Sequence, residues 1–465
     1  MVNIQQLKRL RPLGKLEKVS ASCHHQEFFN NVGLSAHYIL SEPSSPLAGS
    51  DLRRLIYTAV GDVIRKHRIL FVIPVNEDAP DTFFASLPSI DLNRSVTFLE
   101  RSQPFDSSGE DEELDAILES QHNTNFKSEY GTLPFWRLII LRNRGTEKEF
   151  TASFIYHHAI GDGVSGLVFH AAFRNALEAA SPDSKVEDIV IPDEDTLVPP
   201  PLEELHPLPI KPTPPSPSTT ALREWTGNSI RMPCKTRWKS LCFSPDASKA
   251  FFQECKANNQ SVTSGLSSII AMALFSALGL ETEALTCIIP VNLRPWLKLP
   301  CEVGDGAIGS YFDATRVQFT RPRDPGATDV WPGAQQASKA MKDYLQNVSP
   351  SGEPYTAVAI FQTIPDISAV FASMLGKPRD AALEVTNVGR FSSSATGNTA
   401  DAPLWQVGKV ILSRSSLVAG AAVTVSVATG ENGSMTLGFS WQDGVVEDGL
   451  LRSISQGVKK YFEKY

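Results

Sequence analysis

The sequence predicts an α+β protein built from two similar lobes. Apolar residues recur at helical spacing in several segments, β-prone runs bounded by turn residues alternate with them, and one proline-rich stretch interrupts the chain. The length of 465 residues exceeds the about 150 residues of an ordinary domain, so a single core is not expected to serve the whole chain. Each lobe should therefore pack helices against a mostly antiparallel sheet.

The first half alternates helix and strand signals. Apolar residues at helical spacing predict a helix in 52–64, followed by a strand at 71–74. The β-prone runs 135–141 and 150–156 are separated by an Asn-Arg-Gly turn, which favours an antiparallel hairpin over a parallel crossover. Apolar residues then repeat at helical spacing in 164–171, so a helix should follow the hairpin.

A proline-rich segment divides the chain. Nine of the 32 prolines fall between Pro199 and Pro217, a density that removes backbone donors and favours an extended surface connection. We expect a linker at 196–220, which separates an N-terminal lobe (1–195) from a C-terminal lobe (221–465).

The second half repeats the alternation. The patterns predict a helix at 262–278, a strand at 285–295, three successive strands at 405–413, 418–428 and 434–441, and a closing helix from 446. The closing helix carries an apolar stripe with lysines elsewhere. We expect the stripe to pack against its own lobe, and weak peripheral membrane association is the minor alternative.

Composition and charge narrow the class of partner. The formal net charge of −8 opposes binding to a phosphate backbone, so nucleic acid is not expected as a partner, although an isolated basic pocket for a phosphorylated cofactor is compatible with it. No run approaches the about 18 apolar residues that span a bilayer, and the N-terminus lacks a signal-peptide core. The six cysteines show no C-x-x-C spacing, which predicts reduced thiols and a cytoplasmic protein.

The segment 154–166 combines a strand, two histidines, a turn and a helix start. Successive strand side chains face opposite sides, so His157 and His158 cannot both point into one cavity. His158 is nearer the turn and is the expected general base, because a neutral imidazole can accept a hydroxyl proton. His157 should be structural. Asp162 is placed to cap the helix or to pair with a distant arginine, and Gly163 would let a substrate approach the backbone.

Other interpretations of these residues are weaker. Residues 161–166 form a literal G-x-G-x-x-G, but the aspartate between the first two glycines would repel a pyrophosphate, and a hairpin precedes it. The adjacent histidines diverge, no H-E-x-x-H is present and the cysteines are scattered, so no metal site is predicted. A serine nucleophile would need a G-x-S-x-G elbow, which is absent. The pair His24-His25 lacks the Asp-Gly and is interpreted as structural.

The pattern H-H-x-x-x-D-G at 157–163 resembles the active-site signature of chloramphenicol acetyltransferases, peptide-synthetase condensation domains and acyl-CoA-dependent alcohol acyltransferases. The segments RPLGKLEKVS, PFWRL, PVNLRP and TNVGRF resemble the fungal alcohol O-acetyltransferase branch, so the resemblance covers most of the chain. The DFGWG sequence of the plant branch is missing, which leaves the donor-binding residues unassigned.

The resemblance implies two chloramphenicol-acetyltransferase-like lobes, each an α/β two-layer sandwich, that form a pseudo-dimer around a central tunnel. It implies His158 and Asp162 as the catalytic pair: His158 deprotonates a hydroxyl that attacks a thioester directly, and Asp162 supports the site, bonded to an arginine such as Arg294. Asn387 and Gly389 would line the channel, although a turn at a strand end explains them equally well.

The expected function is therefore acyl-CoA-dependent O-acyltransfer, with acetyl-CoA as co-substrate and no metal. The expected acceptor is a small-molecule alcohol, such as a secondary metabolite, and the expected protein is a monomer. Two alternatives stay open: transfer from a carrier-protein thioester, as in condensation domains, and a non-catalytic or repurposed member of the fold.

Overall fold

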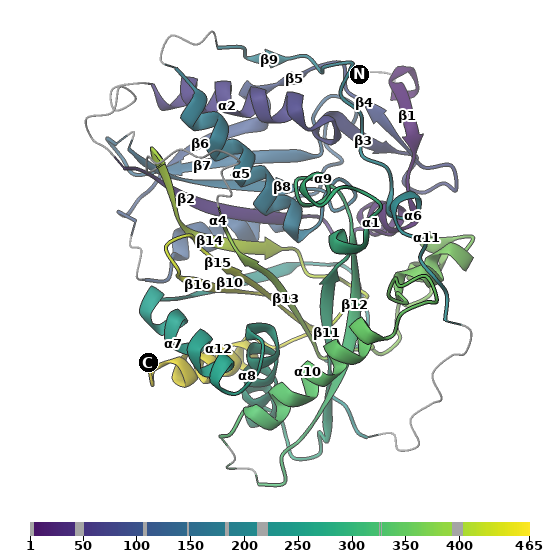
Figure 1. The fold of residues 1–465 in the computed structure, drawn as a ribbon, viewed down its shortest axis with the longest axis vertical. Helices are drawn as coiled ribbons and strands as arrows, with labels where there is room; N and C mark the ends of the chain where they lie inside the picture. Colours follow the sequence, from purple (N-terminus) through teal and green to yellow (C-terminus); the bar gives the residue numbers. More distant parts are fainter. Residues whose placement is uncertain are drawn as a thin grey trace.

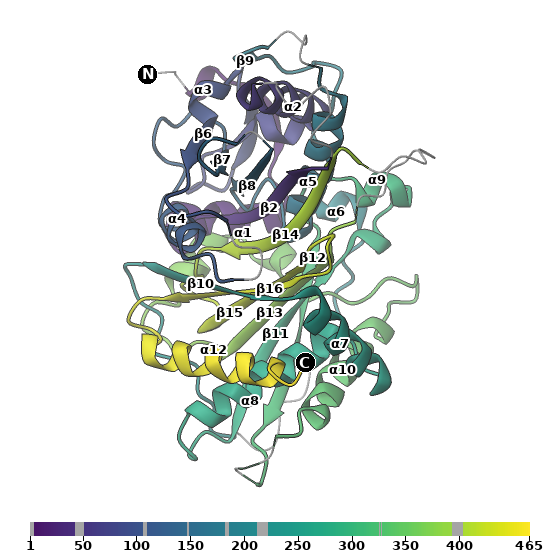
Figure 2. The ribbon, with the colours of Figure 1, turned by 90° about the vertical axis from the view of Figure 1, so that its left-hand side faces the viewer.

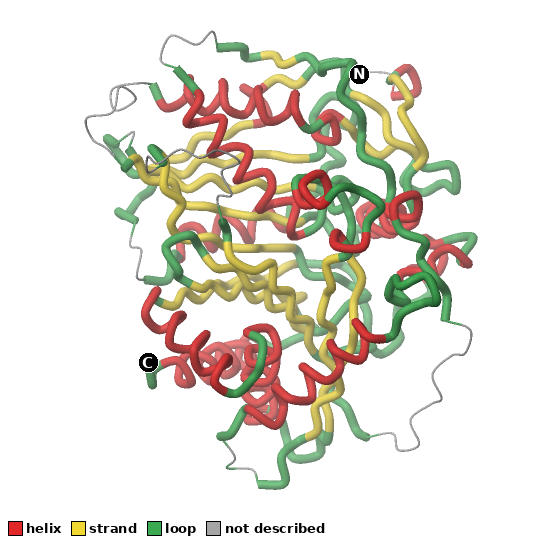
Figure 3. The backbone as a smooth tube through the Cα atoms, viewed as in Figure 1, coloured by secondary structure: helices red, strands yellow, loops and turns green. Residues whose placement is uncertain are grey.

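The computed structural model describes residues 4–41, 51–105, 109–146, 148–181, 186–211, 222–324, 326, 328–392 and 403–465. They form two stacked lobes, each built on one large sheet (Figure 1). Figure 3 shows helices lying over the strands in both lobes. The predicted α+β class is confirmed.

The first lobe contains a five-stranded sheet with the order β14-β2-β8-β7-β6. Its strands are β2 (Val32–Leu40), β6 (Val96–Glu100), β7 (Trp136–Arg142), β8 (Glu149–Tyr156) and β14 (Trp405–Arg414). Only β6 and β7 pair in parallel; the other neighbours are antiparallel. Helices α2 (Leu52–Lys66) and α5 (Gly163–Ala179) pack on each other, and α5 also contacts β2 and β14. This arrangement places the start of α5 beside the end of β8.

The second lobe contains a six-stranded sheet with the order β10-β16-β15-β13-β11-β12. Its strands are β10 (Thr236–Phe243), β11 (Ala284–Asn292), β12 (Phe312–Thr320), β13 (Leu383–Arg390), β15 (Val423–Thr429) and β16 (Met435–Gln442). Strand β13 runs parallel to both β11 and β15. The covering helices are α7 (Pro245–Ala257), α8 (Val262–Ala277), α10 (Trp331–Gln346) and α12 (Asp448–Phe462). The apolar stripe of α12 is buried in the core of this lobe, as expected.

Smaller elements complete the chain. Strands β1 (Lys8–Pro12), β4 (Phe83–Ser86) and β3 (Val72–Val75) form a three-stranded sheet, and β5 (Ile90–Asp91) pairs with β9 (Ile189–Val190). The remaining helices are α1 (Lys15–His25), α3 (Leu92–Ser95), α4 (Glu112–His122), α6 (Leu202–Leu205), α9 (Cys301–Asp305) and α11 (Ile367–Ala372). Short 3-10 turns are η1 (Ile4–Gln6), η3 (Arg68–Phe71), η4 (Arg294–Trp296) and η5 (Val358–Thr363).

The predicted hairpin is confirmed: β7 and β8 pair antiparallel, with Trp136 opposite Tyr156. Two predicted strands have different bounds. The strand at 285–295 ends at Asn292, because Arg294 begins a 3-10 turn whose second residue is a proline. The strand at 418–428 begins only at Val423, because turn residues precede it.

Strand β14 joins the two lobes. Although it comes from the C-terminal part of the chain, it pairs antiparallel with β2 in the first sheet, and it also contacts β15 and β16 of the second (Figure 2). A Cβ atom on Gly438 of β16 would come within 2.9 Å of the carbonyl oxygen of Leu412, so glycine permits this close approach. The lobe boundary at 196–220 stays a prediction, and residues 212–220 lie outside the described residues.

Within the described residues, no single helix has the length and hydropathy of a membrane span. Helices α7 and α8 reach that length and hydropathy only when taken together, and a bend of 101° separates them.

Candidate functional site

The H-H-x-x-x-D-G segment forms the connection between β8 and α5. Strand β8 ends at Tyr156, and α5 begins at Gly163 with Asp162 as its N-cap. The backbone of this connection bonds to the second half of the chain, because the N–H of Asp162 donates to the carbonyl of Gly309 at 3.1 Å. The Ser310 hydroxyl likewise donates to the carbonyl of His158 at 2.7 Å. The motif therefore lies where the two halves of the chain meet.

Asp162 is the centre of a buried polar network. Arg294 donates from Nη1 to Oδ2 at 2.8 Å and from Nη2 to Oδ1 at 3.0 Å, which makes a bidentate ion pair. The N–H groups of Ser165 and Tyr311 donate to the same carboxylate, each at 3.0 Å. Burial alone would raise the pKa of Asp162, but the Arg294 charge and these hydrogen bonds outweigh it and lower the pKa.

The Arg294 guanidinium also bonds to the chain that precedes β12. Its Nη2 atom donates to the carbonyl of Ala307 at 3.0 Å, and the Ser165 hydroxyl donates to the carbonyl of Gly309 at 2.9 Å. The network thus links α5 of the first lobe to residues 294–311 of the second half. The structure brings together Asp162 and Arg294, which are 132 residues apart in the sequence.

His158 lies beside this network in an aromatic setting. The residue is half-buried, and its ring centroid lies 5.6 Å from that of Phe29 and 5.2 Å from that of Phe312. Its Nδ1 atom is buried and has no hydrogen-bond partner among the described residues. The pKa of His158 is lowered to about 4, chiefly by burial and further by the positive charge of Arg414. The backbone of His158 and the negative charge of Asp162 favour the protonated ring and oppose this shift. The ring is therefore neutral at physiological pH.

A second ion pair lies near His158. Arg414 at the end of β14 donates to Glu384 Oε1 on β13, and the Thr386 hydroxyl donates to the same oxygen at 2.9 Å. The guanidinium carbon of Arg414 lies 5.0 Å from the centroid of Phe29, the ring that also contacts His158. Sequence reasoning missed this pair, because nothing in the sequence around either residue indicates a shared location.

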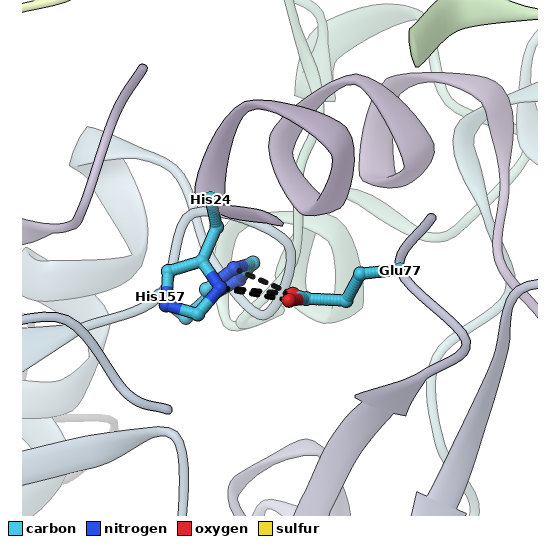
Figure 4. A group of neighbouring side chains, drawn as sticks. All are labelled: His24, Glu77 and His157. Atoms are coloured by element: carbon cyan, nitrogen blue, oxygen red, sulfur yellow. Dashed lines mark hydrogen bonds and ion pairs between the residues drawn. The ribbon is translucent and has the colours of Figure 1, made fainter. Parts of the chain in front are cut away.

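His157 belongs to a different cluster from His158, and its ring lies beside His24 and Glu77 (Figure 4). Its Nε2 atom lies 3.3 Å from Oε1 of Glu77, and its Nδ1 atom accepts from the N–H of Ala159 at 3.0 Å. His24 binds the same carboxylate, with Nδ1 at 2.9 Å from Oε2. The two adjacent histidines therefore belong to different clusters, as expected, although both lie just beyond the end of β8 and not within the strand. No pattern in the sequence indicated that Glu77 and His24 would join His157.

His24, Glu77 and His157 are close enough to be considered as metal ligands, with their ligand atoms all within 4.8 Å of one another. A metal-bound imidazole carries a proton on its other nitrogen and donates it outward. Here those other nitrogens accept from backbone N–H groups: His24 Nε2 from Phe126 at 3.0 Å, and His157 Nδ1 from Ala159. The protons therefore sit on the nitrogens that face Glu77, and this donor set does not fit a metal ion.

Gly163 and the residues predicted to line a channel lie near one another in the fold. A Cβ atom on Gly163 would lie 2.9 Å from Val388 Cγ1, so the glycine allows β13 to approach α5. Asn387 donates to the Thr263 hydroxyl at 3.1 Å and accepts from the N–H of Gly389 at 2.9 Å. Gly389 has φ +85° where the pairing of β13 with β15 is irregular, so backbone geometry explains it. A channel-lining role for Asn387 and Gly389 stays a prediction.

Comparison with known families and relatives supports a single family. The family model for alcohol acetyltransferase matches residues 100–215. The probable alcohol acetyltransferase crmB of Aspergillus fumigatus is 63% identical over 97% of this chain and 99% of its own. The probable alcohol acetyltransferase FCK4 of Fusarium pseudograminearum is 20% identical over 97% of this chain and 94% of its own.

Solved structures agree on the fold. The TRI3 trichothecene 15-O-acetyltransferase from Fusarium sporotrichioides superposes with a TM-score of 0.69 at 12% identity, covering 97% of this chain and 94% of that one. The first condensation domain of the calcium-dependent antibiotic synthetase gives a TM-score of 0.62 at 11% identity, covering 98% and 96%. The expected chloramphenicol-acetyltransferase-like fold is thereby confirmed.

Proposed function

Because the chain belongs to the alcohol acetyltransferase family, we propose that it transfers the acetyl group of acetyl-CoA to the hydroxyl of a small-molecule alcohol, with His158 as the general base. The acceptor class we favour is a secondary-metabolite alcohol. Transfer to oxygen agrees with the name of the O-acetyltransferase pigM of Monascus ruber, which is 30% identical over 21% of this chain. The observation that carries the proposal is the neutral, half-buried imidazole of His158 at the junction of the two lobes.

The ring of His158 has one nitrogen suited to proton transfer. Its Nδ1 atom is buried, whereas the residue as a whole is only half-buried, so the Nε2 edge is the side that a reactant can approach. A neutral imidazole with a lone pair on Nε2 accepts a hydroxyl proton directly. The rings of Phe29 and Phe312 lie beside it and make its surroundings apolar.

The transfer then runs without an acyl-enzyme. Nε2 of His158 takes the hydroxyl proton while the alcohol oxygen attacks the carbonyl carbon of the thioester, forming a C–O bond. The tetrahedral intermediate collapses, the C–S bond breaks, and the imidazolium returns its proton to the CoA sulfur. The products are the acetate ester and free CoA, and His158 is neutral again.

Asp162 supports this chemistry without taking part in proton transfer. Both of its carboxylate oxygens are occupied by Arg294 and by the N–H groups of Ser165 and Tyr311, so none is free to relay a proton to His158. We assign Asp162 and Arg294 the role of fixing the turn that carries His158 against the second half of the chain.

The test is turnover with a matched histidine control. The protein is incubated with acetyl-CoA and a panel of alcohols while free thiol is measured, using wild type, His158→Ala and His25→Ala. His25 is exposed, so its replacement should leave the rate unchanged. His158→Ala should lower kcat at least about 100-fold. A rate that does not depend on His158 would refute the base assignment, and transfer from a loaded carrier protein but not from acetyl-CoA would refute the donor.

A further inference from the structure

The His24–Glu77–His157 cluster is built from three separate parts of the first lobe. His24 lies in the last turn of α1, Glu77 in the loop between β3 and β4, and His157 directly after β8. All three side chains are buried, and the two imidazole rings meet edge to face with centroids 4.6 Å apart (Figure 4). Burying the carboxylate of Glu77 costs free energy, because its charge loses contact with water, so its contacts with the two imidazoles must offset that cost.

Backbone amides fix the proton positions in this cluster. The N–H of Phe126 donates to His24 Nε2, so the His24 proton is on Nδ1. The N–H of Ala159 donates to His157 Nδ1, so the His157 proton is on Nε2. Both protonated nitrogens therefore lie beside Glu77: Nδ1 of His24 forms a hydrogen bond at 2.9 Å, and Nε2 of His157 makes a longer ion-pair contact at 3.3 Å.

His157 also fixes the backbone on both sides of His158. Its own N–H donates to the carbonyl of Phe135 at 2.9 Å, and its ring accepts from the N–H of Ala159, the residue that follows His158. If the His157 proton moved to Nδ1, two N–H groups would face each other across this turn. The position of His158 thus depends on which nitrogen of His157 carries the proton.

We propose that Glu77 is a positioning residue for acetyl transfer: its carboxylate keeps His157 in the Nε2–H form and thereby fixes the turn that presents His158. This inference rests on the proposed function, in which His158 is the base. Glu77 does not touch the reactants and acts only through His157. An ionised carboxylate offers two acceptor oxygens and no donor to the two imidazoles, whereas a protonated acid or an amide keeps one acceptor oxygen and brings a donor into the cluster.

The ionisation of Glu77 agrees with this role. Burial alone would raise its pKa, but the hydrogen bonds and charges of His157 and His24 outweigh burial and lower the pKa to about 2. The carboxylate therefore stays charged at every pH at which the enzyme is expected to work.

The matched experiment compares Glu77→Gln with Asp111→Asn. Asp111 is also a buried carboxylate of the first lobe, paired with Arg101 at 2.7 Å. Arg101 in turn reaches Thr151 on β8, six residues before His157 and so roughly 20 Å away along the strand. Both variants lose a buried carboxylate, but only one of these carboxylates is joined to the turn of His158.

We expect Glu77→Gln to lower kcat roughly 10- to 100-fold while KM for acetyl-CoA and for the alcohol stays within about 2-fold. Asp111→Asn should lower the unfolding temperature and leave kcat within about 2-fold. Glu77→Asp, which retains both acceptor oxygens, should keep more kcat than Glu77→Gln, and it replaces that variant if Glu77→Gln does not fold. Unchanged kcat in the Glu77 variants, or an equal loss in Asp111→Asn, overturns the proposal.

A spectroscopic arm separates this proposal from the function on which it rests. Nitrogen-15 NMR of labelled histidines reports which ring nitrogen is protonated, whether or not the protein turns over. Wild type should show His157 as Nε2–H, and Glu77→Gln should change the signals of both His157 and His158. If wild type transfers no acetyl group, the proposed function fails while this arm still tests the cluster. Finding His157 as Nδ1–H in wild type, or unchanged His158 signals in the variant, overturns the positioning role.

Discussion

Removing the charge of Asp162 should destabilise the protein far more than loss of a helix cap would. Asp162→Asn keeps an oxygen that can cap α5, but it leaves the buried guanidinium of Arg294 facing only neutral acceptors, such as the carbonyls of Ala307 and Gly309. Arg294 is only 4% exposed, so water cannot replace the lost carboxylate. The substitution therefore removes the negative charge while keeping a side chain of nearly the same size and shape.

The expected magnitude follows from the burial of this pair. Breaking a buried ion pair by removing one partner costs about 3–5 kcal/mol, whereas a lost N-cap costs about 1 kcal/mol. Asp162→Asn and Arg294→Met should each lower the free energy of unfolding by about 3–5 kcal/mol. The double variant removes both charges, so it should lose at least about 2 kcal/mol less than the sum of the two single losses.

The assay is urea unfolding of all four proteins at pH 7, followed by circular dichroism, with the unfolding of Asp162→Asn repeated at lower pH. The folded pKa of Asp162 is lowered, so the stabilisation is complete above its unfolded pKa of about 3.9 and is lost as the pH falls through the folded value. Asp162→Asn lacks this pH-dependent stabilisation, so its free energy of unfolding should fall less steeply than that of the wild type as the pH is lowered. Single losses below about 1 kcal/mol, or strictly additive losses, would refute the reasoning.

Three further predictions use other contacts. Arg414→Met should move the acid limb of kcat/KM upward from about pH 4, because burial and Arg414 both lower the pKa of His158; an unchanged limb in a profile from pH 4 to 8 would contradict this. Gly163→Ala should lower the free energy of unfolding, measured by thermal denaturation, by about 1–3 kcal/mol, because the added methyl group would collide with Val388 Cγ1. A second substitution, Val388→Ala, in the same protein should restore most of the lost stability. Dialysis against a chelator should leave the unfolding temperature and turnover unchanged, because His24 and His157 present N–H groups to Glu77; a drop restored by zinc would show that the cluster holds metal.

Local patterns predicted the part of the site that is continuous in sequence. The strand, turn and helix around 154–166 follow from side-chain periodicity and turn residues. Strand alternation predicted separate locations for His157 and His158, and they are in separate clusters, although both residues follow the end of β8. The resemblance then implied that an arginine such as Arg294 would bind Asp162, and the two side chains form an ion pair. Short-range order of this kind is encoded by neighbouring residues.

The long-range part of the site could not be predicted in the same way. Glu77 lies in a loop between two short strands, and Arg414 ends a strand whose apolar pattern says only that it is buried. Their positions depend on which strands pair, and a periodic pattern does not specify a partner. Strand β14 is such a case. Its position in the second half of the chain predicts that it belongs to the second lobe, but it pairs with β2 in the first sheet.

The surroundings of His158 explain why the two halves of the chain act as one unit. The first lobe supplies the imidazole and Phe29, but Ser310, Phe312 and Arg414 come from the second half of the chain. Neither half alone holds the backbone of His158, lowers its pKa and covers its ring. Strand β14 also links the two halves, since it forms the edge of the first sheet with residues from the C-terminal part of the chain. The environment that keeps His158 neutral therefore exists only when both sheets have formed and packed together.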